Sequence, residues 1–429
     1  MTLSFFYGLL FLATWRILRL GPTPPTSRPL WPAGLIALVV TGTAAQLLHP
    51  GLERSWERSA SAIDGGELWR LGTSFLIQGG GAWGMGFNLL TLVITALLTS
   101  RVFHVRGRRA NGGSDTGGLP AALGPVVWVA GGVLGNLLAL AFGFPDGAGS
   151  SLSTMTLAVT AAVASPQLWT RSGRITVGIL AAVSVALLAL HDEHAIAAAL
   201  GAVLGLGLRR GAPDRIVAGA ACWVGTAVFF IGQGVAMAGV TNGYNPVRHM
   251  VSDLGMIGCT PADVGEYHTD VCSPWHLAMN LGFVGTGAAL LAGTVLLRPL
   301  LPPGRLAASG AILLGVGGLG KIGAGLTPGD LYPGAHMAVA IFSGPAPTIG
   351  VLLLGLSLRA TRPVAARTAI LCGAIGVGGF AATSVAMSAG WAGLAERVAM
   401  YPVILWVIGA GAALLVSRRE RRPVPRPAR

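Results

Sequence analysis

Apolar stretches of about twenty residues recur along almost the whole of this 429-residue chain. A helix of about twenty residues is needed to cross a hydrocarbon core of roughly 30 Å, so each stretch is long enough to span a bilayer. Only 10% of the residues are charged and 53% are hydrophobic, whereas soluble domains carry about a quarter charged residues. The chain is therefore predicted to be an integral membrane protein.

The same pattern predicts an all-α fold, a polytopic bundle of about 12–13 transmembrane helices. A polar break at residues 209–214 divides these helices into two six-span modules, with a possible extra helix at the N-terminus. The expected domains are residues 1–30 (an apolar helix and a cytoplasmic linker), 31–210 (the first module), 215–417 (the second module) and 418–429 (a basic, disordered cytoplasmic tail). Residues 106–119, rich in Gly and Ser, are expected to form a cytoplasmic loop.

The distribution of charge predicts topology. The net charge is +13, and most arginines stand in short clusters between the apolar stretches. If the helices alternate in direction, these clusters fall on one side of the membrane, as the positive-inside rule requires of the cytoplasmic side. The expected partner is the lipid bilayer and not nucleic acid. We expect a multi-pass protein of a bacterial cytoplasmic membrane with a cytoplasmic C-terminus.

The chain has four cysteines. Cys222 and Cys372 fall within apolar helices and are expected to be core residues. Cys259 and Cys272 share one polar loop on the predicted outer side, where a disulfide can persist. The residues alone leave open whether this pair is bonded.

The segment that begins at His194 places a reactive side chain on an apolar helix. His194, Gly201 and Gly205 share one helix face, so the imidazole stands above a stripe of small residues. A second apolar helix begins at Ser151 and carries a similar stripe. Close packing of the two helices would bring a serine hydroxyl to an imidazole base that can activate it. Asn88, within a third span, is the expected oxyanion donor, and this chemistry needs no cofactor.

Each of these residues also has a purely structural explanation. Serine at a helix start is commonly an N-cap, and three serines compete for that position: Ser150, Ser151 and Ser153. Asp192 or Glu193 could hold His194 at the membrane interface. Asn88 could simply bind a neighbouring helix.

Four motifs of the first module follow one another along the chain: Gly66-Glu67-Leu68-Trp69-Arg70-Leu71-Gly72-Thr73-Ser74, Asn88 in its helix, Gly149-Ser150-Ser151, and His194 followed by Gly201 and Gly205. Together they resemble the motifs of the rhomboid family of intramembrane serine proteases. The resemblance covers residues 31–210. It implies an endopeptidase in which Ser151 is the nucleophile, His194 is the base, and Asn88 and the Ser151 backbone N–H bind the oxyanion. It also implies single-span membrane proteins as substrates, cut near the outer leaflet, with Trp69 and Arg70 anchoring the first loop among the lipid headgroups.

The chain departs from the rhomboid pattern at three positions. Gly84 precedes Asn88 where the family carries a histidine, Leu152 follows Ser151 where the family carries a glycine, and Gln78 stands in place of another histidine. The alternative is therefore an inactive, rhomboid-like scaffold that binds membrane helices.

The second module carries polar residues on its predicted outer side. Four of them are candidate metal ligands: His249, Asp253, His276 and His336. A metal held there could activate water and make this module a hydrolase; a transporter is the other active alternative. The simpler interpretation is a cap of two ion pairs, Arg248 with Asp253 and Glu396 with Arg397. Lys321, the only lysine, lies within an apolar span and is either functional or extended to the outer interface.

Four elements of this second half stand out together: Asn245–Gly255, Gly325–Asp330, His336 and Gly393–Arg397. They resemble the bacterial domain-of-unknown-function 998 family of membrane proteins, and the resemblance runs from Ile216 to Ser417. It implies a membrane fold but no reaction.

Overall fold

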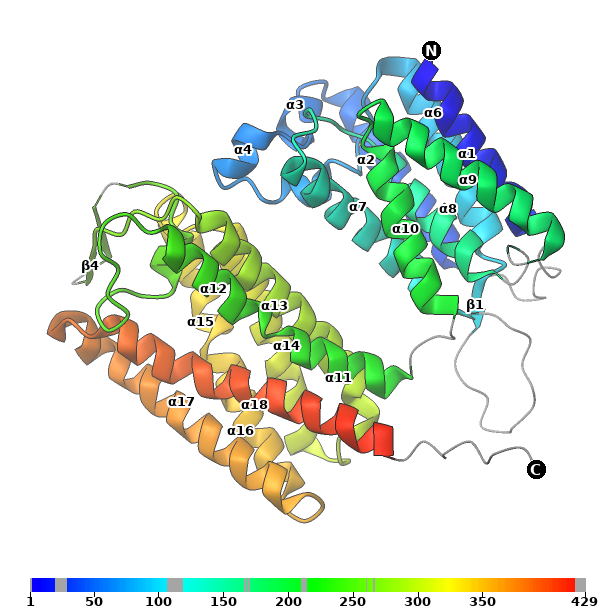
Figure 1. Cartoon of the computed structure of the whole chain (residues 1–429). Helices are drawn as coiled ribbons and strands as arrows, with labels where there is room; N and C mark the ends of the chain where they lie inside the picture. Colours follow the sequence, from blue (N-terminus) through cyan, green and yellow to red (C-terminus); the bar gives the residue numbers. More distant parts are fainter. Residues whose placement is uncertain are drawn as a thin grey trace, which may run out of the picture. The chain divides into compact units, whose positions relative to one another are not determined.

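The computed structural model describes residues 2–19, 29–105, 119–165, 168, 170–209, 214–259, 261–264 and 267–420. Most of the predicted cytoplasmic loop (residues 106–118) and of the predicted basic tail (residues 421–429) lies outside these ranges. The chain forms two compact units (Figure 1). Unit 1 comprises residues 1–63 and 67–213, and unit 2 comprises residues 64–66 and 214–429.

Unit 1 is built almost entirely of helices, with one short parallel strand pair. Its helices are α1 (Thr2–Arg19), α2 (Trp31–Leu48), α3 (Leu52–Trp56), α4 (Ala60–Asp64), α5 (Arg70–Thr73), α6 (Gly81–Thr99), α7 (Leu123–Ala141), α8 (Ser151–Ala164), α9 (Arg171–Ala189) and α10 (His194–Arg209), and its strands are β1 (Phe103–Val105) and β2 (Leu119–Pro120). The short helices α3, α4 and α5 belong to the long connection between α2 and α6.

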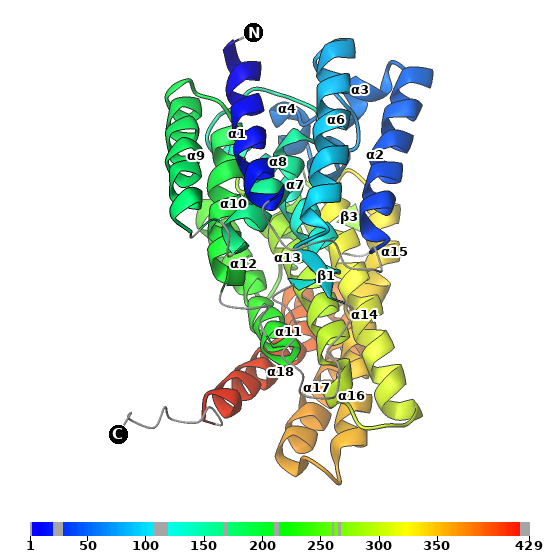
Figure 2. The same ribbon diagram turned by 90° about the vertical axis from the view of Figure 1, so that its right-hand side faces the viewer.

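Helix α8 occupies the centre of unit 1. Every residue from Leu152 to Val163 is buried, and α8 contacts α1, α6, α7 and α10 (Figure 2). A helix of this length is about 21 Å long, which is shorter than a hydrocarbon core of roughly 30 Å. Because other helices surround α8, its first residue Ser151 can lie below the level of the membrane surface.

Unit 2 is a second helical bundle with one antiparallel strand pair. Its helices are α11 (Arg215–Gly225), α12 (Val228–Gly239), α13 (His276–Leu297), α14 (Arg305–Leu326), α15 (Pro333–Ser343), α16 (Pro345–Leu358), α17 (Pro363–Ala389) and α18 (Ala392–Glu420), with 3-10 turns η2 (Ser252–Gly255) and η3 (Arg298–Leu300) and strands β3 (Ala262–Val264) and β4 (Tyr267–Thr269). Residues 240–275, between α12 and α13, carry η2, β3 and β4, and we call this segment the polar loop.

Two of the long apolar stretches each form a pair of helices. The stretch at residues 216–240 forms α11 followed by α12, and the stretch at residues 335–358 forms α15 followed by α16. The second break lies at Gly344, directly before Pro345. Proline has no N–H to continue the helical hydrogen bonds, which explains why the regular helix stops there.

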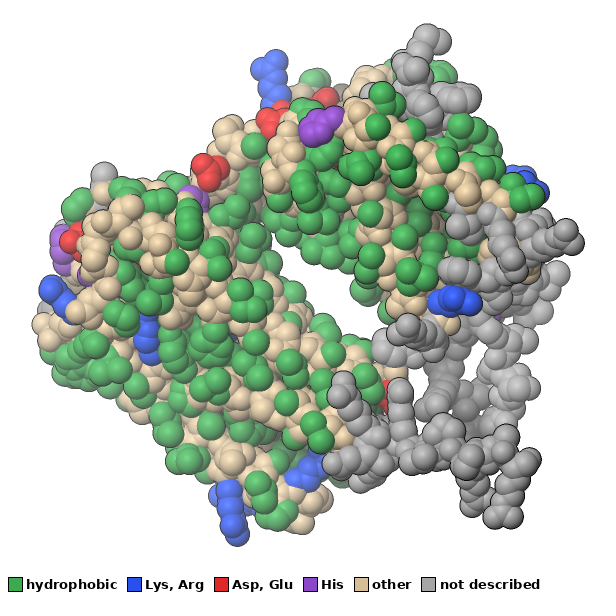
Figure 3. All heavy atoms as spheres, in the orientation of Figure 1, with side chains coloured by type: hydrophobic (Ala, Val, Ile, Leu, Met, Phe, Trp, Pro, Cys, Tyr) green, Lys and Arg blue, Asp and Glu red, His purple; other side chains and the backbone are tan. Residues whose placement is uncertain are grey.

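Within the described residues, nine helical segments are long and apolar enough to cross a membrane, and three shorter apolar helices accompany them: Ser151–Ala164, Gly178–Ala189 and His194–Arg209. The predicted all-α polytopic bundle is confirmed. Large apolar side chains such as Leu90, Val203 and Ile312 are exposed on the helix flanks. Figure 3 shows hydrophobic side chains covering those flanks and most charged side chains near the helix ends.

Candidate functional site

The first residues of α8 and α10 lie at the same end of unit 1. Thr156 Oγ1 on α8 donates a hydrogen bond of 3.2 Å to the Ala197 carbonyl on α10. A Cβ atom at Gly201 would lie 2.8 Å from the Thr156 carbonyl oxygen, and one at Gly205 would lie 2.8 Å from the Thr160 carbonyl oxygen. The helices therefore pack backbone to backbone through the predicted glycines. The contacts move toward higher residue numbers on both helices at once, which means that α8 and α10 run parallel.

This packing sets the heights of the two candidate catalytic residues. Ser151 lies about 8 Å along its helix from Thr156, and His194 lies about 10 Å along its helix from Gly201. Since Thr156 and Gly201 are in contact, Ser151 and His194 begin their helices at closely similar depths.

His194 is held by a carboxylate and a tyrosine. The residue is 7% exposed, and its Nδ1 and its backbone N both lie 2.9 Å from Asp192 Oδ1. Tyr7 donates a hydrogen bond to the other oxygen of Asp192, and its ring lies against the imidazole, tilted by 35° with a centroid separation of 4.1 Å. Nδ1–H is thereby committed to Asp192, which leaves Nε2 as the basic nitrogen.

The carboxylate of Asp192 remains ionised. Burial acts to raise its pKa, but the hydrogen bond and the charge of His194, together with the Tyr7 hydroxyl, outweigh burial and hold the pKa below its ordinary value. An ionised Asp192 fixes the tautomer of His194 and would stabilise an imidazolium.

Three polar side chains converge beside Gly149. A Cβ atom built on Gly149 would lie 2.8 Å from Asn88 Nδ2, 3.7 Å from Ser151 Oγ and 3.8 Å from Gln78 Oε1. Gly149 has a φ of +149°, a conformation that residues with a side chain rarely adopt. Glycine at this position therefore leaves room for Asn88 to approach the start of α8.

Gln78 links several parts of this site by hydrogen bonds, a role that the sequence does not reveal. It is 1% exposed, its N–H donates to Gln46 Oε1 at 2.8 Å, and its carbonyl accepts from Gln46 Nε2 at 2.7 Å. Its Oε1 accepts from Asn88 Nδ2 at 2.9 Å and from the Ser150 N–H at 3.3 Å, while its Nε2 is buried without a hydrogen-bond partner. The resemblance to the rhomboid pattern shows only that Gln78 stands where that family carries a histidine.

The serines at the start of α8 differ from one another. Ser150 is the N-cap residue, yet its side chain makes no capping hydrogen bond. The hydroxyls of Ser150 and Ser153 are buried without partners, whereas Ser151 is partly exposed. Among the hydrogen bonds of the described residues, none joins Ser151 to His194, so the structure brings the two to one end of unit 1 without linking them directly.

Arg70 does not reach the lipid headgroups as predicted. Its side chain is buried, with Nε 2.6 Å from Glu67 Oε2 and Nη1 2.7 Å from the Arg54 carbonyl oxygen. The guanidinium is thus used to fold the loop between α2 and α6, because its fan of N–H donors satisfies carboxylate and carbonyl oxygens together.

In unit 2, the four predicted metal ligands are engaged separately. His249 Nδ1 accepts from the Asn245 N–H at 3.0 Å, and His276 Nδ1 lies 3.2 Å from the Ser273 carbonyl oxygen. His336 Nδ1 lies 2.6 Å from the Thr327 carbonyl oxygen, and Asp253 accepts hydrogen bonds from Tyr267 and from the Met250 N–H. In the part of the chain that the structure describes, no three His, Cys, Asp or Glu side chains gather closely enough to share a metal ion.

The predicted cap of ion pairs is also not formed within the described ranges. Glu396 accepts a hydrogen bond from the Val251 N–H. Arg397 donates to the carbonyl oxygens of Pro246 and His249, at 2.7 and 2.9 Å. Both residues therefore attach α18 to the polar loop, but through the backbone and not through each other. A disulfide between Cys259 and Cys272 closes the same loop.

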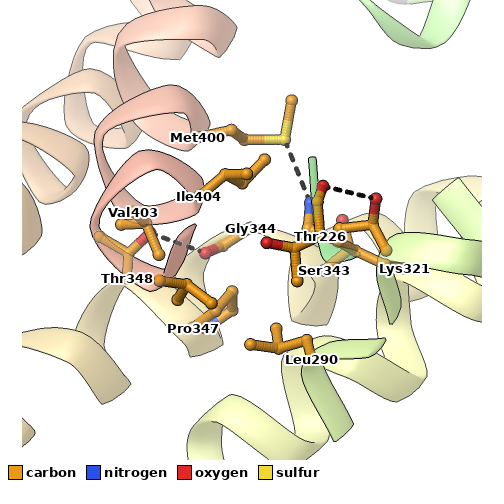
Figure 4. Close-up of a pocket in the computed structure, with 12 residues that line it drawn as sticks. Thr226, Leu290, Lys321, Ser343, Gly344, Pro347, Thr348, Met400, Val403 and Ile404 are labelled. Atoms are coloured by element: carbon orange, nitrogen blue, oxygen red, sulfur yellow. Dashed lines mark hydrogen bonds between the residues drawn. The ribbon is translucent and has the colours of Figure 1, made fainter. Parts of the chain in front are cut away.

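Lys321 is buried inside unit 2 and does not extend to the interface. It is 2% exposed, its Nζ lies 3.6 Å from Met400 Sδ, and it lies 5.5 Å from the ring centroid of Phe229. Figure 4 shows Lys321 beside Thr226 and Ser343 at a cavity of about 10 Å³, which is room for about one water molecule. Among the described residues Lys321 makes no ion pair with a carboxylate.

Comparison with known proteins adds one match. Residues 223–413 match the family model described as a protein of unknown function, DUF998. No curated protein and no solved structure matches the chain. The match lies within unit 2 and agrees with the predicted resemblance of that half, and it does not extend to the serine and histidine of unit 1.

We expect Gly149→Ala to lower the reactivity of Ser151 at least tenfold, because the new Cβ displaces Asn88 and the backbone is strained. Labelling of the purified protein with a fluorophosphonate probe measures this. Gly143→Ala is the matched control, since Gly143 also has a positive φ, +69°, but no atom within 4 Å of its Cβ position. Equal labelling of the two variants would show that Asn88 does not matter for reactivity.

We expect unit 2 to lose stability as the pH rises from about 4 to 8. Burial raises the pKa of Asp253 to about 7, above the unfolded value of about 3.9. A raised folded-state pKa gives stability that is complete below the unfolded pKa and is lost as the pH rises through the folded pKa. The difference of about 3 pKa units corresponds to a change on the order of 4 kcal/mol. Melting temperatures of Asp253→Asn should vary less with pH than those of wild type. Asp270→Asn, which changes a half-exposed carboxylate, should behave as wild type does; a wild-type profile in Asp253→Asn would refute the assignment.

Proposed function

We propose that unit 1 is an intramembrane serine endopeptidase that cleaves membrane-protein substrates near the outer leaflet of a bacterial cytoplasmic membrane. The observation that carries this proposal is the buried network of Tyr7, Asp192 and His194, which leaves His194 Nε2 as a base at the depth of Ser151. Asp192 alone could hold an interfacial histidine. The hydrogen bond from Tyr7 to the same carboxylate, and the Tyr7 ring lying against the imidazole, favour the catalytic interpretation.

In the proposed reaction Ser151 Oγ attacks the scissile carbonyl while His194 Nε2 takes the hydroxyl proton. The same nitrogen then gives the proton to the leaving amine, and water hydrolyses the acyl-enzyme by the reverse roles. Asn88 Nδ2 and the Ser151 N–H, in the first turn of α8, are the donors for the oxyanion. The short, surrounded helix α8 would keep this chemistry below the membrane surface.

Fluorophosphonate labelling of the full chain in detergent tests the proposal. We expect wild type to be labelled, Ser151→Ala and His194→Ala to lose the label, and Ser150→Ala to keep it, because Ser150 is the neighbouring buried serine. Loss in Ser150→Ala but not in Ser151→Ala would move the nucleophile to Ser150. Absence of label in folded wild type would overturn the proposal.

An inactive scaffold is the second candidate function. It is favoured by the missing hydrogen bond between Ser151 and His194 in the described residues and by the engagement of Asn88 with Gln78. Equal binding of a single-span helix by wild type and Ser151→Ala, without cleavage by either, would support it.

A further inference from the structure

A ligand-sized cavity lies in unit 2, apart from the proposed protease site. Its volume is about 200 Å³. Its walls come from the polar loop, from the connection between α14 and α15, from the start of α15 and from Met387 near the end of α17. Pockets that combine an apolar wall with a few fixed polar groups are typical ligand sites.

One wall of the cavity presents acceptors that lack donors. Asp330 Oδ2 accepts from the backbone N–H groups of Ile257 and Gly258, at 2.9 and 2.6 Å. Its other oxygen, Oδ1, is buried and has no hydrogen-bond partner. The carboxylate is therefore held rigidly by one oxygen while the other remains available, and an unsatisfied buried acceptor is costly unless a ligand or water supplies a donor.

His336 adds a second acceptor to the same cavity. Its Nδ1 lies 2.6 Å from the Thr327 carbonyl oxygen, and a carbonyl can only accept, so Nδ1 carries the proton. In the neutral imidazole Nε2 is then an acceptor. Asp330 lies in the connection between α14 and α15, and His336 lies in the first turn of α15, so one short segment of the chain supplies both groups.

The cavity has an acidic group and no internal cation. Asp330 lines it, and no Lys or Arg is among its lining residues. Asp253 lines it too, but burial raises the pKa of that carboxyl to about 7, so Asp330 is the carboxylate that a cation would meet. Asp330 belongs to no ion pair in the described ranges. A buried carboxylate requires a compensating partner, so this cavity favours a cationic ligand.

The apolar part of the lining indicates what else the ligand carries. Four methionines contribute to it: Met250, Met256, Met337 and Met387. Methionine is apolar, flexible and polarisable and adapts its shape to apolar groups. A hard divalent metal is a poor match, because the described residues offer no group of three His, Cys, Asp or Glu ligands.

We infer that this cavity binds a small organic ammonium ion that carries an apolar group. The ammonium N–H groups donate to Asp330 Oδ1 and His336 Nε2, and the apolar group packs on the methionines. This site is independent of the proposed protease chemistry of unit 1.

The test is a titration of the full chain in detergent with 2-phenylethylammonium, compared with 2-phenylethanol, which has a similar shape but no charge. Isothermal titration calorimetry measures both. We expect saturable binding of the amine and at least tenfold weaker binding of the alcohol. Equal affinities, or no saturable binding of the amine by folded wild type, would overturn the inference.

Two variants separate the site from the fold. Asp330→Asn keeps an acceptor for the Ile257 and Gly258 N–H groups but removes the charge, and it should weaken amine binding at least tenfold. Met387→Lys leaves the connection between α14 and α15 unchanged and places an ammonium group at the cavity. This ammonium should compete with the amine and weaken its binding at least tenfold. Asp270→Asn, a carboxylate outside the cavity, should bind as wild type does. Wild-type affinity in both cavity variants would contradict the inference.

Discussion

Replacing Asp192 with asparagine is expected to slow labelling of Ser151 by about 10²–10⁴-fold while leaving unit 1 folded. The asparagine cannot offer His194 Nδ1–H an ionised acceptor, so the tautomer is no longer fixed and an imidazolium is no longer stabilised. The pKa of Asp192 lies below its ordinary value, so this carboxylate stays ionised throughout pH 5–8.

Two further variants give this prediction its controls. Asp146→Asn makes the same change at an exposed carboxylate of the connection between α7 and α8, and it should be labelled at the wild-type rate. Tyr7→Phe removes one hydrogen bond to Asp192 and should slow labelling by less than Asp192→Asn does. Labelling of Asp192→Asn at the wild-type rate would show that Asp192 does not contribute to the reactivity of Ser151.

The membrane fold could be predicted because it depends on local properties of the sequence. Stretch length and apolarity specify the spans, and the glycines after His194 specify the face on which α10 meets α8. The breaks inside two spans were missed, since the apolar character continues across Gly344 and Pro345. Proline is tolerated within membrane helices when neighbours satisfy the backbone, so its presence does not locate a break.

Of the two side chains that hold His194, the sequence offers Asp192 as a possible partner but gives no sign of Tyr7. Tyr7 and Asp192 are 185 positions apart, and nothing in the first apolar stretch indicates that α1 packs against α9. The two ion pairs expected in unit 2 failed for a related reason. Opposite charges that are close in sequence form an ion pair only if no backbone group offers better geometry. Here Arg397 donates to a backbone carbonyl and Glu396 accepts from a backbone N–H instead.

Arg58→Ala is expected to destabilise unit 1 by about 3–5 kcal/mol, the usual cost of removing one partner from a buried ion pair. Arg58 is 1% exposed. Its Nη2 lies 2.6 Å from Glu193 Oε2, and its Nη1 donates to Asn136 Oδ1 at 3.0 Å. The loss would leave Asn136 and the Pro145 carbonyl without their donor. Glu193 is partly exposed and can regain water, which favours the lower end of this range.

The free energy of unfolding in detergent, measured by chemical denaturation, checks this expectation. Arg54→Ala removes an exposed arginine from the same loop and should change stability by less than about 0.5 kcal/mol. Because Glu193 directly precedes His194, Arg58→Ala should also reduce labelling of Ser151, whereas Arg54→Ala should not. Arg58→Lys keeps the charge but loses the forked geometry and should fall between the two. Equal unfolding free energies for Arg58→Ala and Arg54→Ala would show that the buried guanidinium does not anchor the segment that carries His194.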